Sequence, residues 1–138
     1  TVADNYEWWI ADGAPLAREV DFLGVHTYPA WENKTIDESL AYTIENIERV
    51  HAALPEKPIA ILEAGWATVA AEFSEQASEE NQARYYNEVL DWATAANVTV
   101  FFFEAFDEPW KGNPDNADGA EKHWGVFNVD RTPKLVMQ

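Results

Sequence analysis

The chain carries carboxylates where short apolar segments end, and these are its first candidates for chemistry. Residues 58–66 form an apolar run that ends in Glu63, a small residue, a glycine and a tryptophan. Residues 98–104 form a second apolar run, which ends in Glu104 and is followed by Glu108. A carboxylate held at such a position can act as a nucleophile or as a general acid or base. These three glutamates are therefore candidate catalytic residues.

The apolar segments themselves predict the elements that would position these groups. Apolar runs this short, bounded by proline and glycine, are typical of buried strands in a parallel sheet. A third run, residues 20–28, ends in Tyr28, and residues 1–4 look like the last part of a further strand. The carboxyl ends of parallel strands meet at one edge, and in α/β barrels that edge carries the active site. The strands should therefore deliver carboxylates, aromatic rings and Lys111 to a single rim.

Two helical patterns separate the predicted strands. Thr35 followed by Glu38 matches a capping box, and apolar residues then recur at helical spacing. Ser78 is placed to cap a second helix, and Asn97 suits the left-handed residue that ends one. The order of elements predicts a parallel α/β sheet of about four strands, joined by right-handed crossovers. We expect residues 1–138 to form a single domain.

The composition argues against several classes of partner. The chain has 25 acidic and 9 basic side chains, for a formal net charge of −16. Such a surface repels phosphate backbones and anionic lipid, so we expect neither nucleic acid nor a membrane as a partner. Solubility or a salt-adapted source would also explain the acidity. The chain has no Cys and only 3 His, and we expect no metal site.

Nothing in the sequence predicts a membrane segment. No apolar run approaches the roughly 18 residues of a membrane span, and no signal peptide is visible. The chain begins with Thr1 rather than Met, which we interpret as a processed or excised piece. The compartment stays open, and a soluble protein, secreted or periplasmic, is compatible with the sequence. The 7 Trp, 5 Tyr and 7 Phe suit a core, although sugar sites also use flat aromatic faces.

The motif around the first carboxylate resembles that of a known family. Residues 63–66, Glu-Ala-Gly-Trp, follow Lys-Pro-Ile-Ala-Ile-Leu and resemble the nucleophile motif of glycoside hydrolase family seventeen, the β-1,3-glucanases. The family usually continues with Pro-Ser, where this chain has Ala67-Thr68. Residues 103–111, followed by 121–127, are similar to the family's last strand and loop, and residues 22–29 to its sixth strand. The resemblance spans nearly the whole chain.

This resemblance implies half of a barrel. The family fold is the eight-stranded (β/α)8 barrel, and the chain matches only strands five to eight. Strands one to four are missing from the match, together with the Asn-Glu that supplies the family's general acid. A (β/α)4-like half barrel exposes two unpaired strand edges, which invite pairing with another chain. We therefore expect a twofold homodimer, in which Glu104 or Glu108 of the partner subunit takes the place of the missing acid.

The resemblance also implies roles for individual residues. Glu63 would be the nucleophile of a retaining glycosidase, and Tyr28 would hydrogen-bond its carboxylate. The polar groups that would flank the site are Glu108, Lys111 and Glu121. The apolar walls and sugar platforms would be Trp66, Phe106 and Trp124. Structural alternatives remain open: Glu104 could simply pair with Lys111, and the flanking polar groups could form a salt-bridge network.

The sequence thus favours a glycoside hydrolase that cleaves a β-linked glucan such as laminarin with retention, without metal or cofactor. One alternative is a catalytically inactive remnant that binds carbohydrate or only self-associates. Another is a fragment of a longer enzyme, which would need its missing half supplied in trans.

Overall fold

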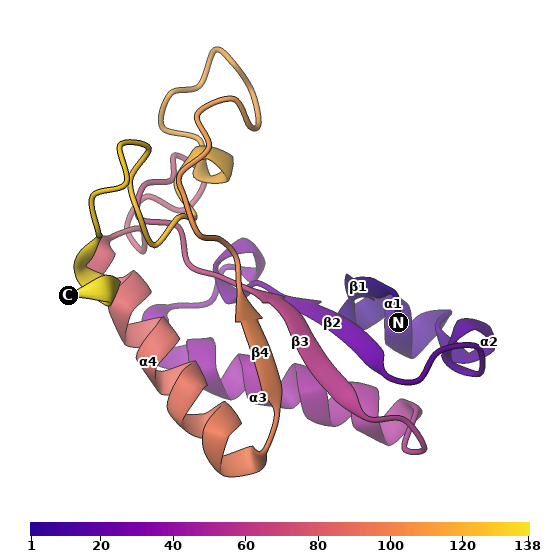
Figure 1. Cartoon of the computed structure of the whole chain (residues 1–138). Helices are drawn as coiled ribbons and strands as arrows, with labels where there is room; N and C mark the ends of the chain where they lie inside the picture. The colour runs from indigo at the N-terminus through magenta and orange to yellow at the C-terminus, as the bar shows by residue number, and fades with distance from the viewer.

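The fold is built on a parallel sheet of four strands. The computed structural model describes all of residues 1–138. The strands are β1 (Ala3–Asn5), β2 (Leu23–Thr27), β3 (Ile59–Ala64) and β4 (Thr99–Phe102), and they lie side by side in chain order (Figure 1). All three neighbouring pairs are parallel. The predicted parallel sheet is confirmed, although each strand is shorter than the apolar run that predicted it.

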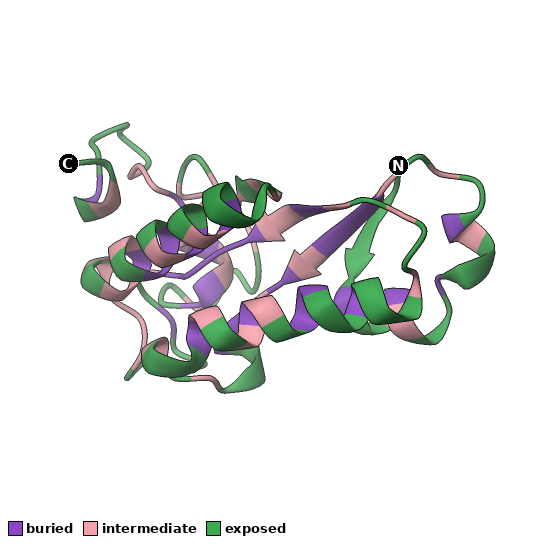
Figure 2. Ribbon diagram, turned by 90° about the horizontal axis from the view of Figure 1, so that it is seen from below, coloured by how far each residue is buried: buried purple, intermediate pink, exposed green.

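Two long helices connect the central strands and cover one face of the sheet (Figures 1 and 2). They are α3 (Ile36–Ala53) and α4 (Glu79–Ala96). Two short helices lie near the N-terminus, α1 (Tyr6–Ala11) and α2 (Ala14–Ala17). Three 3-10 turns complete the chain: η1 (Pro29–Glu32), η2 (Ala120–Lys122) and η3 (Leu135–Met137). None of the helices combines the length and the apolar character needed to cross a bilayer.

The long helices begin and end where the local signals place them. The Glu38 carboxylate accepts hydrogen bonds from the backbone N–H and the hydroxyl of Thr35, at 2.9 and 2.7 Å. The Ser78 side chain accepts from a backbone N–H in the first turn of α4, and Asn97 ends that helix with a left-handed φ of 55°. These three helix ends use backbone groups that have no hydrogen-bond partner within the helix.

The core lies between the sheet and the long helices. Leu23, Val25 and Ile61 point into it from the strands and are completely buried, and Val50 and Val89 meet them from α3 and α4. Successive side chains of a strand point to opposite faces, so their sequence neighbours line the other side of the sheet. Burial of this one apolar face is what holds the strand ends in place.

The opposite face of the sheet is open and partly apolar. Phe101 of β4 is 58% exposed there, whereas its neighbours in the strand pack against the core. An open groove of about 360 Å³ runs along this face, lined mainly by Phe22, Ala60, Leu62, Thr99 and Phe101. In a closed barrel such a face would be the packed interior. The chain therefore has the surface of a half barrel.

Candidate active site

The strand ends place Glu63 at the centre of the candidate site. It lies near the end of β3, next to His26 of β2 in the sheet register. The Tyr28 hydroxyl donates a hydrogen bond of 2.6 Å to Oε2 of Glu63, and Nδ1 of His26 lies 3.5 Å from the same oxygen. The Glu63 side chain is still 33% exposed. The carboxylate is therefore anchored through Oε2, and its side chain remains partly accessible to solvent.

Tyr28 is held in place as a hydrogen-bond donor. Its ring packs edge-on against Trp124 and Phe103, with centroids 5.2 and 6.1 Å apart. Burial, and then the hydrogen bond to Glu63, raises the pKa of Tyr28 well above its usual value. The hydroxyl therefore keeps its proton throughout the ordinary pH range and can donate a hydrogen bond to the carboxylate.

The glycine after the candidate nucleophile is required by packing. A Cβ on Gly65 would collide with the carbonyl oxygen of Phe103, and it would lie 3.1 Å from Trp124 and 3.3 Å from Tyr28. The backbone N–H of Phe103 also donates to the carbonyl of Ala64 at 2.8 Å. The chain that leaves β4 therefore lies directly against the chain that leaves β3, and only glycine allows this approach.

The carboxylates that follow β4 are gathered around Lys111. Its Nζ donates to Oε2 of Glu104 at 2.6 Å, and it pairs with Glu108 as well. The ammonium also lies 4.4 Å from the ring centroid of Phe103, within cation–π range. Within one copy of the chain, the salt-bridge interpretation of these residues is therefore the one that the structure displays.

Burial and pairing shift the pKa values of Glu104 and Glu108 in opposite directions. Burial raises the pKa of Glu104, although the hydrogen bond from Lys111 opposes the shift. The hydrogen bond from Lys111 instead lowers the pKa of Glu108. One oxygen of Glu104, Oε1, is buried without a hydrogen-bond partner. Glu104 is therefore the member of the pair that holds a proton more readily, as a general acid must.

Glu121 is less closely tied to these groups than expected. It is the second residue of η2 and lies beside Gly112, where an added Cβ would meet the Glu121 side chain at 3.0 Å. It forms no ion pair, whereas Glu104 and Glu108 both do.

No group of three or more His, Cys, Asp or Glu side chains is arranged to hold a metal ion.

The expected role of Trp66 as a sugar platform is wrong. Its side chain is completely buried, its Nε1 donates to the carbonyl of Gln76 at 2.9 Å, and its ring packs against Tyr85. Trp124 is only 1% exposed. Its ring packs against the ring of Tyr28 and offers no free face to a sugar. Phe106 is 43% exposed and packs against Phe127.

Two exposed tryptophans were missed by sequence reasoning. Trp31 is 38% exposed at the rim, where its ring lies 5.2 Å from Phe73 and 6.1 Å from Trp124. Trp110 is 74% exposed, and Lys111 lies 5.6 Å from its ring. Trp31 lies three residues after Tyr28 and Trp110 lies six residues after Glu104, so both are in loops that follow predicted strands, and this position is the available signal. An aromatic face that remains free at the rim is the kind that can pack on a sugar ring.

Comparisons with known proteins show which family the chain is related to. Residues 1–125 match the model of the BtgE/BtgC glycoside hydrolase domain. A glucan 1,3-beta-glucosidase of Arthroderma benhamiae is 32% identical over 148 residues, which cover 96% of this chain and 48% of the relative. The chain thus spans about half the length of this relative and of another glucan 1,3-beta-glucosidase, from Schizosaccharomyces pombe.

Solved structures show the same relationship. An endo-laminarinase from Formosa Hel1_33_131 superimposes with a TM-score of 0.88 at 30% identity, over 98% of this chain and 44% of that one. A glycoside hydrolase family 17 β-1,3-glucanosyltransferase from Rhizomucor miehei gives a TM-score of 0.84 at 33% identity, over 97% and 47%. The expected resemblance is confirmed, and the chain belongs to the family of BtgE/BtgC glycoside hydrolase domains.

Proposed function

We propose that the chain supplies the nucleophile half of a retaining glycoside hydrolase that acts on β-1,3-linked glucan. The observation that carries the proposal is the anchored, accessible carboxylate of Glu63, which accepts a 2.6 Å hydrogen bond from Tyr28 at the carboxyl end of a parallel strand. The substrate class is taken from the relatives, which are named as glucan 1,3-beta-glucosidases, an endo-laminarinase and a glucanosyltransferase.

The proposed reaction uses the two oxygens of Glu63 differently. Tyr28 and His26 both face Oε2, so Oε1 is free to attack the anomeric carbon of the sugar. The new carbon–oxygen bond forms as the glycosidic bond breaks, and a general acid protonates the leaving sugar oxygen. Water then attacks the glycosyl-enzyme to complete hydrolysis, whereas a sugar hydroxyl would complete a transfer. Two inversions at the anomeric carbon give net retention. Trp31 and Trp110 would offer faces for neighbouring sugar rings.

The general acid comes from outside these four strands, and we propose that a second copy supplies it. The open apolar face around Phe101 and the unpaired edge of β4 are the surfaces that a second half barrel would cover. Glu104 or Glu108 of the partner subunit would then face Glu63. Retention requires carboxyl groups about 5–5.5 Å apart, and the raised pKa of Glu104 suits the acid.

The test is the release of reducing sugar from laminarin. The purified chain is assayed over a range of concentrations, beside Glu63→Gln and beside Glu48→Gln as a control on the outer surface of α3. Release that disappears only in Glu63→Gln, and whose specific rate rises with chain concentration, supports the proposal with a second copy as partner.

Two other results would direct the proposal elsewhere. Release that appears only when strands one to four of a related enzyme are added would keep Glu63 as nucleophile and refute the homodimer. Laminarin binding without release under either condition would refute the enzymatic proposal, and it would favour a carbohydrate-binding remnant.

A further inference from the structure

A buried lysine lies in the C-terminal segment, beyond residue 125, where the match to the family model ends. This residue, Lys134, directly precedes η3. Its side chain is only 2% exposed. Removing an ammonium group from water is costly unless charge and hydrogen bonds compensate it. The partners that compensate Lys134 therefore show what the residue holds together.

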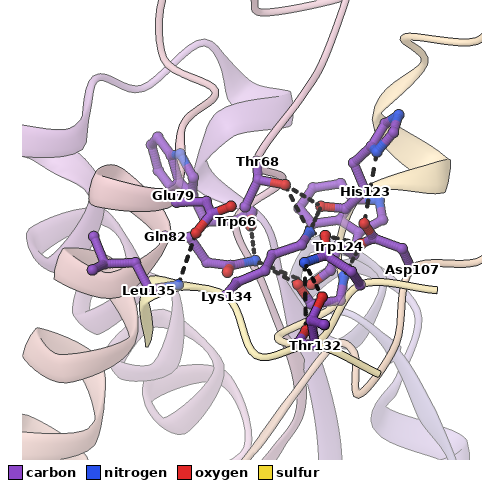
Figure 3. A network of polar contacts seen from close by, with 12 residues as sticks. Trp66, Thr68, Glu79, Gln82, Asp107, His123, Trp124, Thr132, Lys134 and Leu135 are labelled. Atoms are coloured by element: carbon purple, nitrogen blue, oxygen red, sulfur yellow. Dashed lines mark hydrogen bonds and ion pairs between the residues drawn. The ribbon is translucent and has the colours of Figure 1, made fainter. Parts of the chain in front are cut away.

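The ammonium of Lys134 binds three different segments of the chain (Figure 3). It donates to Oδ1 of Asp107 and to the hydroxyl of Thr68, each at 2.7 Å, and more weakly to the carbonyl of His123 at 3.5 Å. Asp107 is itself 9% exposed and also accepts from the backbone N–H of Gly125 at 3.0 Å. The ion pair is thus buried, the ammonium donates to three oxygens, and Oδ1 of Asp107 accepts two hydrogen bonds.

Each of these segments carries part of the candidate site. Thr68 lies in the loop that follows Glu63, and Asp107 lies between Glu104 and Glu108 in the loop that follows β4. His123 and Gly125 flank Trp124, the ring that supports Tyr28. The ammonium contacts the nucleophile loop and the Glu104–Lys111 loop at the same time, through Thr68 and Asp107.

Lys134 can act as an anchor because its own backbone is fixed. Its N–H donates to the carbonyl of Val126 at 3.0 Å, and the next N–H, of Leu135, donates to the Glu79 carboxylate at the start of α4 at 2.8 Å. From the other side, buried Gln82 of α4 donates to the carbonyls of Trp66 and Gly125 at 2.9 and 3.1 Å. The C-terminal segment is therefore attached to a rigid helix.

We infer that Lys134 is a positioning residue, which with Asp107 holds the Glu104–Lys111 loop in register with the loop that follows Glu63. Its effect on catalysis rests on the proposed function, but its effect on loop order does not. We therefore expect the C-terminal segment, which follows the residues matched by the family model, to set the geometry between the nucleophile and the Lys111 cluster.

The test replaces Lys134 and follows two independent readouts. Lys134→Met removes the charge and leaves Asp107 buried without its cation, so Lys134→Met with Asp107→Asn is made as a second variant that leaves no unpaired charge. Lys57→Met is the matched control, because Lys57 also makes a part-buried hydrogen bond, to the carbonyl of Val20, away from the site.

The first readout is amide hydrogen exchange. Loss of the ion pair should speed exchange at Glu104, Asp107 and Gly125 roughly tenfold or more, with much smaller changes at Val25 and Ile61 in the sheet. Unchanged exchange at the loop amides, or an equal increase throughout the sheet, would overturn the inference. This readout decides the matter even if the chain shows no activity on glucan.

The second readout is laminarin hydrolysis by the assembled enzyme, which is the homodimer or the chain with strands one to four of a related enzyme added. A positioning role predicts a fall in kcat of roughly tenfold or more with little change in KM, in both Lys134 variants and not in Lys57→Met. Loop amides that exchange faster while kcat stays at the wild-type value would refute the catalytic part of the inference. Absence of activity in the wild-type chain would instead count against the proposed function.

Discussion

Replacing Tyr28 by Phe tests how the candidate nucleophile is held. The substitution removes the hydroxyl that donates to Glu63 and keeps the ring, which remains packed against Trp124 and Phe103. A hydrogen bond to a charged group contributes about 1.5–3 kcal/mol, or roughly a 10- to 150-fold change in rate. Because the Glu63 side chain is 33% exposed, water replaces part of the lost interaction. We therefore expect kcat/KM to fall about tenfold, at the lower end of the range.

The assay for this variant is steady-state hydrolysis of laminarin by the assembled enzyme, with a thermal melt of the same sample. Tyr85→Phe is the matched control, since its hydroxyl bonds Thr43 beneath the sheet and does not face Glu63. The control should lose about 1 kcal/mol of stability and keep its kcat/KM. A Tyr28→Phe enzyme with wild-type kcat/KM would refute the argument that Tyr28 orients the nucleophile.

Three further predictions concern packing, pH and salt. Gly65→Ala should destabilise the chain by about 1–3 kcal/mol in a denaturant titration, because its Cβ meets the Phe103 carbonyl; an unchanged midpoint would contradict that contact. Burial raises the pKa of Glu104 above 4.5, so its contribution to stability is complete below about pH 4.5 and is lost as pH rises through the raised native pKa. Melts from pH 4 to 8 should therefore show Glu104→Gln gaining on the wild type as pH rises, and a constant difference would refute the shift. Each copy carries a net charge of −16, so self-association measured by sedimentation should strengthen between 0.1 and about 1 M salt; weaker association at high salt would count against the apolar face as interface.

Local sequence patterns predicted most of the fold. Thr35 and Glu38 predicted the start of α3, and Asn97 predicted the end of α4, because capping depends on residues that are close in sequence. The parallel sheet followed from short apolar runs that alternate with helical patterns. The position of Glu63 at a strand end, with Tyr28 at the end of the neighbouring strand, needed only this order of elements.

Long-range packing decided what the sequence could not show. A tryptophan beside a nucleophile motif looks the same whether its face is free or buried, and Trp66 is buried because Tyr85 of α4 packs on it. Lys134 gave no local signal either, since its partner Thr68 lies in a loop on the far side of α4 in the sequence. The sequence does not decide whether Lys111 pairs with Glu104, because the distance between them depends on how the loop folds back.

The most direct test of the central claim is to trap the glycosyl-enzyme. The assembled enzyme is incubated with a 2-deoxy-2-fluoro laminaribioside that bears a good leaving group, and its peptides are then weighed by mass spectrometry. If Glu63 is the nucleophile, the peptide that contains residues 58–66 gains the mass of the fluorinated disaccharide, and Glu63→Gln gains none. A stable adduct on a different carboxylate, in a chain that releases sugar, would contradict the account.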